Sequence, residues 1–358
     1  MEFEIKYDFF RYSFFIIAWL LGFIFQIRLK FIKLQNTNEI KNRKISVIIP
    51  VRNESKNISK VLYHLKNQKY KPYEIIVVDD NSEDNTVQIA KNYDVKIISL
   101  NSDPPDGWTG KNWALWNGYL ASEGELLLFL DADVEPREDF IEVLLSNYEH
   151  YKGLISCWPY QRFEKLYEHL NFAFNLIPIF SMFILSKSEG AFGPSILISR
   201  EDYEKVGGNR EIKNKIIEDM ALAKKCLEKN IPVNNFLGGE YIKFRMYQSF
   251  KDLFEGFTKN MAKGAFSVNF FNFLLIFLFM YGIYGSIFYF KENLINIFYI
   301  LFVIQFYIIS RRLGDYKLYD AILYPIHFLF FSFVFIYSIF RSFFVKTVIW
   351  KGRKIRVD

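Results

Sequence analysis

The sequence predicts an α/β fold with a mostly parallel sheet, joined to transmembrane helices at its N-terminus and C-terminus. Short β-branched runs alternate with helical stretches over residues 44–245, which is the pattern of strand–helix–strand units. Long apolar runs precede and follow that region. The 358 residues are 51% hydrophobic and 23% charged, a mixture that indicates apolar and polar segments separated along the chain.

The first apolar run covers residues 9–27 and is followed at once by Arg28 and Lys30. A secretory signal peptide has its basic residues before the apolar stretch and a small-residue cleavage site after it. Neither feature is clear in this sequence. We therefore expect residues 1–30 to be a retained membrane anchor.

Three short apolar runs in the central region each end in a polar turn, at Ile45–Ile49, Ile75–Val78 and Leu126–Leu130. Helical stretches lie between them, around Ser59–Gln68 and Thr86–Tyr93. Strands that alternate with helices form parallel sheets, and the ligands of such sheets bind at the carboxyl ends of the strands. We therefore expect the ligand site at one edge of the sheet.

Apolar character returns in the last third of the chain. Val268–Phe290 is about 23 residues, or roughly 34 Å as a helix, which is enough to cross a bilayer core of about 30 Å. Leu294–Ser310 and Ala321–Phe340 are expected to be membrane helices too. Residues 267–345 would then hold the C-terminal membrane helices, after an interfacial linker at residues 246–266.

One apolar stretch inside the central region is different. Leu170–Leu185 contains Asn175 and Pro178, and as a helix it would reach only roughly 24 Å. That length is too short to cross a bilayer. An interfacial or buried helix is the better interpretation.

Basic residues predict the orientation of the chain. They cluster just after the first anchor, over residues 28–44, and just before the next span, at Lys259 and Lys263. By the positive-inside rule this places the α/β domain on the cytoplasmic side of a multi-pass protein of the cell membrane. The basic tail, residues 346–358, would lie outside if the last segment crossed. Pro325 offers a break into a re-entrant or interfacial hairpin, which would keep the tail inside.

Composition excludes several other classes of protein. A net charge of +6 is too small to indicate a nucleic-acid partner, and no basic stripe alternates with aromatic residues. Cys157 and Cys226 have no metal-binding or redox spacing, so they form no disulfide framework. The four histidines are scattered and predict no zinc site.

The first strand ends in Pro50 and a polar loop that contains Arg52 and Glu54. Such a loop places backbone groups at the sheet edge, where a nucleotide can lie. The alternative is an ordinary turn in which Asn53 or Ser55 caps the next helix. The loop alone fits both interpretations equally.

The second strand ends in two adjacent carboxylates, Asp79 and Asp80. Like charges held side by side repel each other and cost stability unless something uses them. An N–H donor of a nucleobase is one candidate partner for Asp80, and helix capping by Ser82 or Asp84 is the alternative. Together with the first strand end, this pattern favours nucleotide binding.

The third strand ends in Asp131-Ala132-Asp133. The motif places two hard oxygen ligands at the mouth of the sheet. Magnesium and manganese prefer such ligands and bind through one or two carboxylates and the phosphates of a substrate. A lone Asp-x-Asp is a weak signal, but its place after a strong strand, with acidic residues at an earlier strand end, predicts a divalent-metal site.

In this order and spacing the three strand ends resemble the family 2 glycosyltransferases with a GT-A fold, which is Rossmann-like. The resemblance implies that Asp80 reads the uracil ring of a UDP-sugar donor and that the loop from Pro50 to Glu54 lies against the nucleoside. It also implies that Asp131 and Asp133 bind Mg²⁺ or Mn²⁺, with Asp133 as the direct ligand.

The segment Gly107-Trp108-Thr109-Gly110-Lys111 is similar to the Gly-x-x-Gly-Lys segment of lipid-modifying members of that family. The similarity implies a diphosphate contact for Lys111, and the alternative is a solvated lysine at a helix start. Trp108 is expected on the acceptor side of the site. So are Phe192 and Gly193, in a segment that precedes a short predicted strand.

Glu218 and Asp219 match the Glu-Asp motif of the family, whose Asp is the general base of inverting transfer. The alternative is a helix N-terminus that carries acids because of the helix dipole. A base would be needed for an alcohol acceptor but not for a carboxylic acid, which is already ionised near pH 7. The intact pair therefore favours a hydroxylated lipid acceptor.

The resemblance extends over most of the remaining chain. Four segments are similar to a membrane-bound carotenoid-type glucosyltransferase group that includes the diaponeurosporenoate and hydroxychlorobactene glucosyltransferases: Phe244–Gln248, Glu255–Asn260, Arg311–Gly314 and Trp350–Arg353. This implies a hexosyltransferase that moves one sugar, glucose, from a UDP-sugar to a carotenoid or other terpenoid alcohol or acid in the membrane.

Several alternatives are weighed against that function. The Gln-x-x-Arg-Trp motif of polysaccharide synthases has no counterpart after Asp219, which favours a single transfer over chain growth. A processive polysaccharide synthase and a ceramide-type lipid glucosyltransferase remain the alternatives within the family. A nucleotidyltransferase would have a Gly-rich loop after the first strand, and residues 51–55 contain no glycine. A non-enzymatic scaffold leaves the set of acidic residues unexplained.

Overall fold

The structure is a computed structural model that describes residues 2–27, 29–36, 42–184, 187–288, 293–345, 347–350 and 353–356. The chain divides into two compact units. The α/β unit comprises Lys30–Arg162, Gly190–Glu255 and Lys346–Asp358. The helical unit comprises Met1–Leu29, Phe163–Glu189 and Gly256–Val345.

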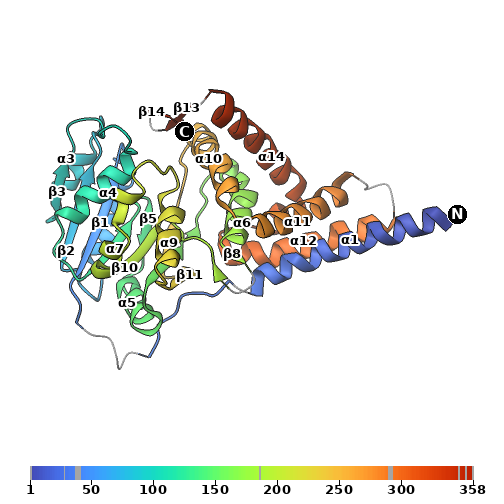
Figure 1. Ribbon diagram of the computed structural model, residues 1–358, viewed down its shortest axis with the longest axis horizontal. Coiled ribbons are helices and arrows are strands. Elements are labelled where there is room, and N and C mark those ends of the chain that lie inside the picture. The colour runs from blue at the N-terminus through green and yellow to red at the C-terminus, as the bar shows by residue number, and fades with distance from the viewer. Residues whose placement is uncertain are drawn as a thin grey trace. The chain divides into compact units, whose positions relative to one another are not determined.

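A seven-stranded sheet forms the centre of the α/β unit, in the order β11-β6-β10-β4-β1-β2-β3 (Figure 1). All neighbouring strands are parallel except β10, which runs antiparallel to β4 and β6. The mostly parallel sheet that the sequence predicts is therefore confirmed. The strands are β1 (Ile45–Val51), β2 (Glu74–Asp79), β3 (Lys96–Ser99), β4 (Leu126–Leu130), β6 (Leu154–Trp158), β10 (Ser195–Ser199) and β11 (Val233–Leu237).

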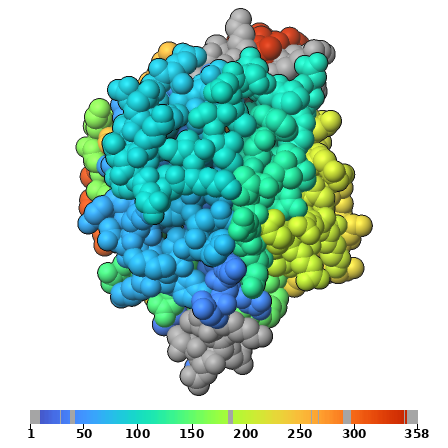
Figure 2. Space-filling model, turned by 90° about the vertical axis from the view of Figure 1, so that its left-hand side faces the viewer, coloured from blue at the N-terminus to red at the C-terminus, as the bar shows by residue number. Residues whose placement is uncertain are grey.

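Helices cover both faces of this sheet, because the central strands are apolar on both sides. Along β1, Val47 and Ile49 belong to one buried cluster with residues of α2 and α5, whereas Ile48 belongs to a second with residues of α4 and α9. This alternation follows the two-residue period of a strand. The helices are α2 (Ile58–Lys66), α3 (Thr86–Ala90), α4 (Gly110–Leu120), α5 (Phe140–Tyr151), α7 (Arg200–Lys205), α8 (Gly208–Glu211) and α9 (Glu218–Glu228). Figure 2 shows the side of this unit where β3 is the edge strand.

The other strands of the described residues form three smaller sheets. β12 (Ile242–Phe244) pairs antiparallel with β5 (Val134–Pro136) and parallel with β7 (Tyr160–Gln161). Because β5 begins directly after Asp133, this sheet fixes the position of the chain that follows the Asp-x-Asp motif. Two hairpins are formed by β8 (Phe183–Ile184) with β9 (Lys187–Ser188) and by β13 (Thr347–Trp350) with β14 (Arg353–Arg356).

The helical unit holds the long apolar segments. Among the described residues, three helices are long and apolar enough to cross a membrane: Phe10–Ile27, Phe270–Phe288 and Tyr324–Val345. The predicted segment Leu294–Ser310 lies in another long helix that is not one of these three, so its crossing stays a prediction. The elements are α1 (Glu2–Ile27), η2 (Leu166–Asn171), α6 (Phe172–Ser181), α10 (Phe250–Ser267), α11 (Phe270–Phe288), α12 (Asn293–Leu313), α13 (Leu318–Ile322), α14 (Tyr324–Phe340) and a π-helical turn, Arg341–Val345.

Within the predicted segment Leu170–Leu185, Phe172–Ser181 form helix α6, most of whose residues are buried, but this helix does not belong to the α/β unit. Helix α6 packs among the helices: Phe174 stacks on Phe257 at 3.8 Å between ring centroids, and Asn175 Nδ2 donates to Tyr316 Oη at 2.6 Å. The predicted domain over residues 44–245 is thus interrupted, because residues 163–189 leave the sheet and pack in the helical unit.

The last predicted apolar segment, Ala321–Phe340, is interrupted at Leu323, between α13 and α14. Pro325 lies just after this break, in the first turn of α14, where a missing backbone N–H costs nothing, and the helix then continues to Phe340. Pro325 therefore introduces no turn within α14, and the side of the membrane on which the tail lies stays a prediction. Lys346 and parts of the basic tail, residues 351–352 and 357–358, lie outside the described residues.

Candidate active site

The strand ends bring the predicted site residues to one edge of the sheet. β1, β2 and β4 are parallel, so their carboxyl ends lead into Pro50, Asp80 and Asp131 at the same edge. β10 is antiparallel, so its amino end lies there too, and Asp131 N donates to Pro194 O at 3.0 Å. The order of strands therefore places the segment of Gly193 beside the metal motif.

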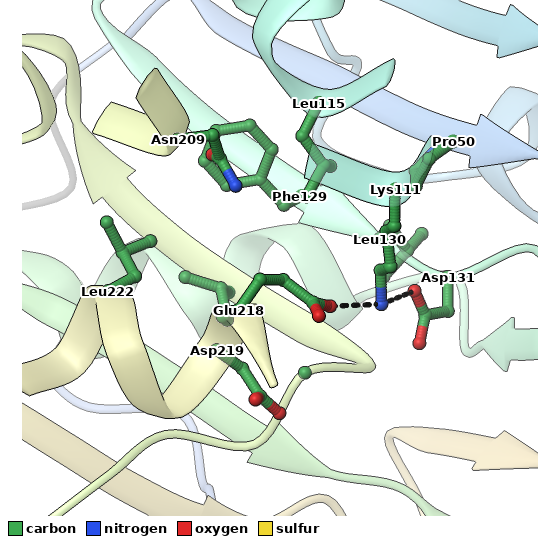
Figure 3. Close-up of a pocket in the computed structure, with 12 residues that line it drawn as sticks. Pro50, Lys111, Leu115, Phe129, Leu130, Asp131, Asn209, Glu218, Asp219 and Leu222 are labelled. Atoms are coloured by element: carbon green, nitrogen blue, oxygen red, sulfur yellow. Dashed lines mark ion pairs between the residues drawn. The ribbon is translucent and has the colours of Figure 1, made fainter. Parts of the chain in front are cut away.

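A pocket opens at this edge (Figure 3). It contains six of the predicted site residues: Pro50, Lys111, Asp131, Gly193, Glu218 and Asp219. Its other lining residues are Leu115, Phe129, Leu130, Ile196, Asn209 and Leu222. The pocket thus combines an apolar wall with one cationic and three anionic side chains.

Lys111 lies between two of those carboxylates (Figure 3). Its Nζ is 2.8 Å from Asp131 Oδ1 and 2.7 Å from Glu218 Oε1. Burial would lower the pKa of this ammonium group, but the charges of Asp131 and Glu218 outweigh it and raise the pKa well above its ordinary value. Lys111 is thus at a helix start, as the alternative has it, but its ammonium group is ion-paired in the pocket.

The start of α4 fixes the backbone of Lys111. Thr109 caps the helix by accepting from Asn112 N at 3.3 Å, and its own N–H donates to Lys213 O at 2.8 Å. Gly107 has a φ of 79°, a left-handed conformation that glycine adopts without strain. The Gly-x-x-Gly-Lys segment is thus a turn and helix cap that aims Lys111 at the pocket.

A buried amide pair holds this segment from behind. Asn209 Nδ2 donates to Asn112 Oδ1 at 2.6 Å, and Tyr203 Oη donates to Asn209 Oδ1 at 2.7 Å. Both asparagines are almost completely buried. Sequence reasoning missed Asn209 because its partner lies 97 residues away, and no local pattern marks a buried asparagine as part of a site.

Glu218 and Asp219 are the first two residues of α9, as the helix-start alternative has it, and both line the pocket. Asp219 is half-buried in the pocket, and desolvation together with the charge of Glu218 raises its pKa to about 7, although Lys111 acts in the opposite direction. At neutral pH the carboxylate and the protonated acid would then both be populated. A group with this pKa is well suited to accept a proton near pH 7.

Gly193 leaves room for Asp219. A Cβ atom built on Gly193 would lie 2.7 Å from Asp219 Oδ2, closer than such contacts normally come. We expect Gly193→Ala to displace the carboxylate and lower kcat by about 10²-fold, since displacements of about 1 Å can cost that much. Steady-state kinetics would measure the loss, with Ser195→Ala, at the start of β10, as the control variant. Unchanged kcat in Gly193→Ala would contradict this role of the glycine.

The two predicted acceptor-side aromatic residues have different surroundings. The ring of Phe192 is buried and packs edge-on against Trp158, with 5.4 Å between centroids, while the backbone N–H donates to Ser156 Oγ at 2.6 Å. Phe192 therefore supports the turn before Gly193. Trp108 is half-buried beside Trp113, with 5.0 Å between centroids, on the segment that leads to Lys111.

On the predicted nucleoside side, the loops after β1 and β2 are tied together. Arg52 Nη1 donates to Asp80 O at 2.6 Å and to Asn81 O at 2.9 Å. Glu54 N donates to Thr86 Oγ1 at 2.8 Å. Arg52 thus holds the loop that carries Asp80, and hydrogen bonds join the two predicted binding segments.

The acidic side chains at and after the end of β2 have different surroundings. Asp79 accepts from Ser82 N at 3.2 Å, and Asp84 accepts from Ser55 N at 3.1 Å and from Thr86 N at 3.0 Å. Asp84 thus binds the first backbone N–H of α3, although the N-cap position itself is Asn85, whose side chain makes no capping hydrogen bond. Asp80 is also buried at the strand end, and its backbone N–H donates to Val51 O at 2.8 Å.

The residues of the Asp-x-Asp motif fit a divalent cation. The Asp131 carboxylate is 28% exposed at the pocket and already binds a cationic group, the ammonium of Lys111. Among the described residues, no three His, Cys, Asp or Glu side chains gather closely enough to hold a metal ion without other ligands. This suits Mg²⁺ or Mn²⁺, which take one or two carboxylates and complete their shell with water and substrate phosphate.

Tyr247 is a further residue near this motif that sequence reasoning did not single out. Burial, followed by the charges of Asp133 and Asp131, raises the pKa of its hydroxyl well above the ordinary value. The phenol therefore stays protonated and can donate a hydrogen bond. β5 and β12 are paired antiparallel. Asp133 lies just before β5 and Tyr247 just after β12.

The chain is similar to known proteins over most of its length. The chain matches the family model described as Glycosyl transferase family 2 over residues 46–207. It is 31% identical over 341 residues to 4,4'-diaponeurosporenoate glycosyltransferase of Staphylococcus aureus (strain USA300). This match covers 90% of this chain and 91% of the relative. Identity to the protein of the same name from Staphylococcus haemolyticus (strain JCSC1435) is 36%, over 87% of this chain and 88% of the relative.

Among solved structures, the mannosyltransferase PcManGT from Pyrobaculum calidifontis, in complex with GDP-Man and Mn²⁺, has the same fold with a TM-score of 0.57. The identity is 13%, and the match covers 96% of this chain and 98% of that one. The likeness therefore includes the helical segments as well as the sheet.

Proposed function

This chain belongs to glycosyltransferase family 2, and on that premise we propose that it transfers one glucose unit from a UDP-sugar to a lipid acceptor, with inversion at the anomeric carbon. The predicted family and the predicted GT-A fold are confirmed, and the enzyme is a hexosyltransferase. The observation that carries the proposal is the pocket in which Lys111, Asp131 and Asp219 meet.

The donor would lie across the carboxyl ends of the strands. Asp80, at the end of β2, would accept from the uracil ring, and the loop from Pro50 to Glu54 would pack against the nucleoside. Asp131 and Asp133 would hold a divalent cation, whose charge offsets the charge that builds up on the departing diphosphate. Lys111, at the N-terminus of α4, would add a second positive charge there, together with the helix dipole.

The acceptor would enter beside Asp219 and Gly193. As the acceptor oxygen forms its bond to the anomeric carbon, the bond from that carbon to the diphosphate oxygen breaks and its electrons leave with the nucleotide. Asp219 takes the proton of an attacking hydroxyl group. One displacement of this kind inverts the anomeric configuration.

An apolar acceptor is favoured by the rest of the chain. Three helices of the helical unit are apolar enough to cross a membrane, and the curated relatives carry the name of a carotenoid acid glycosyltransferase. We propose a carotenoid or other terpenoid alcohol or acid as the acceptor, reached from the cytoplasmic side of the cell membrane. The predicted alternatives, a processive polysaccharide synthase and a ceramide-type lipid glucosyltransferase, differ from it in product length and in acceptor.

The purified full-length enzyme, supplied with a panel of UDP-sugars and extracted host lipids, tests this proposal. We expect one lipid product whose mass corresponds to the addition of a single hexose, formed fastest from UDP-glucose. Mass spectrometry identifies both the lipid and the number of sugars. A ladder of products would indicate chain growth, and a sphingolipid product would indicate the ceramide-type alternative. If no UDP-sugar served as a donor, the proposed donor would be wrong.

A further inference from the structure

The metal motif of this protein already has a cationic partner from the chain itself. Lys111 Nζ lies 2.8 Å from Asp131 Oδ1, the oxygen of a predicted metal ligand, and 2.7 Å from Glu218 Oε1. We propose that Lys111 is an exchangeable cation that competes with the divalent metal for Asp131 and moves to the diphosphate when the nucleotide binds. The inference rests on the proposed function, because it assumes a metal and a nucleoside diphosphate in this pocket.

Competition follows from charge and space. A divalent ion bound through Asp131 would share a carboxylate whose Oδ1 atom the ammonium group now contacts, and Mg²⁺ holds its oxygen ligands at about 2.0–2.1 Å. Two cations on one carboxylate also repel each other strongly in a partly buried pocket. Metal binding at Asp131 therefore requires Lys111 to weaken or leave this contact.

The side chain of Lys111 is able to move while its backbone is fixed. Its flexible four-carbon stem carries a compact charge that can change partners without a change in the main chain. The lysine side chain is 32% exposed and that of Asp131 is 28% exposed, so neither is sealed in the core. In contrast, the adjacent Asn112 is completely buried and bonded to Asn209.

A diphosphate provides the alternative partner. Lys111 is the second residue of α4, so the N-terminus of that helix, with its positive dipole end, lies beside it and favours a phosphate group. A diphosphate there would draw the ammonium group away from Asp131. Nucleotide binding would thus make Asp131 available to the metal, and by linkage the metal would favour nucleotide binding to the same degree.

The test measures Mn²⁺ binding rather than turnover. Electron paramagnetic resonance of free Mn²⁺ gives its dissociation constant for the full-length protein in detergent, with and without UDP. For Lys111→Met we expect Mn²⁺ alone to bind about tenfold more tightly than to the native protein, which is within the usual range of coupling between sites. The factor by which UDP tightens Mn²⁺ binding should be smaller in Lys111→Met, because the competitor is already gone.

Two further variants make the result specific. Lys213→Met removes an exposed lysine beside Gly107 and should leave Mn²⁺ affinity unchanged, so it controls for the loss of one positive charge. Lys111→Arg keeps the charge and should bind Mn²⁺ alone no more tightly than the native protein, which gives a readout even if Lys111→Met does not fold.

The outcomes separate this inference from the proposed function. If Lys111→Met binds Mn²⁺ alone no more tightly than the native protein while both bind UDP with Mn²⁺, the competition is wrong and the proposed function stands. Tighter binding of Mn²⁺ by Lys111→Arg would overturn it in the same way. If the native protein binds no UDP in the presence of Mn²⁺, the proposed function itself fails.

Discussion

Asp219→Asn is expected to lower the rate of transfer to a hydroxylated lipid by about 10²–10⁴-fold, the usual contribution of general acid–base catalysis. The carboxylate lines the pocket at the start of α9, with its pKa raised to about 7, whereas an asparagine cannot accept the proton. Single-turnover rates with a saturating UDP-sugar would measure the loss. UDP binding should persist, because the donor contacts that we propose lie on other strand ends.

The same variant tests which acceptor the enzyme uses. Transfer to a carotenoid acid should fall by less than about tenfold in Asp219→Asn, because a carboxylate needs no base near pH 7. In the native enzyme, kcat/KM for a hydroxyl acceptor should rise as the pH increases through about 7, as Asp219 loses its proton. The variant should lack this rise. An unchanged rate with a true hydroxyl acceptor would contradict the assignment of Asp219 as the base.

Stability separates a catalytic effect from misfolding. The pKa of Asp219 is higher in the folded state than in the unfolded chain, so this residue costs stability as the pH rises from about 4 to about 7. Asp219→Asn should therefore unfold at the same temperature as the native protein or higher at pH 8. Asp202→Asn, which changes an acid in the first turn of α7 outside the pocket, is the matched control and should retain full activity.

Much of this site could be predicted from the sequence because it depends on strand ends. Asp80 and Asp131 follow short apolar runs, and parallel strands bring such ends to one edge whatever the details of packing. Lys111 stood out because its segment is similar to the Gly-x-x-Gly-Lys segment of lipid-modifying family members. These signals are local, so one stretch of sequence is enough to detect each of them.

The remaining features depend on contacts between distant parts of the chain. Nothing near Lys111 in the sequence indicates Glu218 as its second partner, and nothing near Asn112 indicates Asn209. The placement of α6 was missed for the same reason. Its apolar sequence predicts an interfacial or buried helix. Only the packing of Phe174 and Asn175 shows that it is buried among helices rather than against the sheet.

Removal of the divalent metal is expected to abolish transfer, and Asp133→Asn to lower kcat by about 10³-fold. The argument is electrostatic: a bound cation contributes several kcal/mol to the stabilisation of a departing diphosphate, and each 1.4 kcal/mol is a factor of ten in rate. Lys111 remains in Asp133→Asn as one positive charge at the pocket, so some activity should persist. Activity after treatment with EDTA, and its recovery with added Mn²⁺ or Mg²⁺, measures the dependence on metal.

Asp133→Asn and Asp131→Asn should differ in a way that generic damage would not produce. Asp131 binds both the proposed metal and Lys111, whereas Asp133 has no role in holding Lys111 in our proposal. Asp133→Asn should therefore need more Mn²⁺ for half-maximal activity, and saturating Mn²⁺ should restore part of the rate. Glu138→Gln, an exposed acid after β5, is the matched control and should behave as the native enzyme does. Full activity of Asp133→Asn in the presence of EDTA would show that transfer proceeds without a metal at this motif, and Lys111 and the N-terminus of α4 would then have to stabilise the leaving group alone.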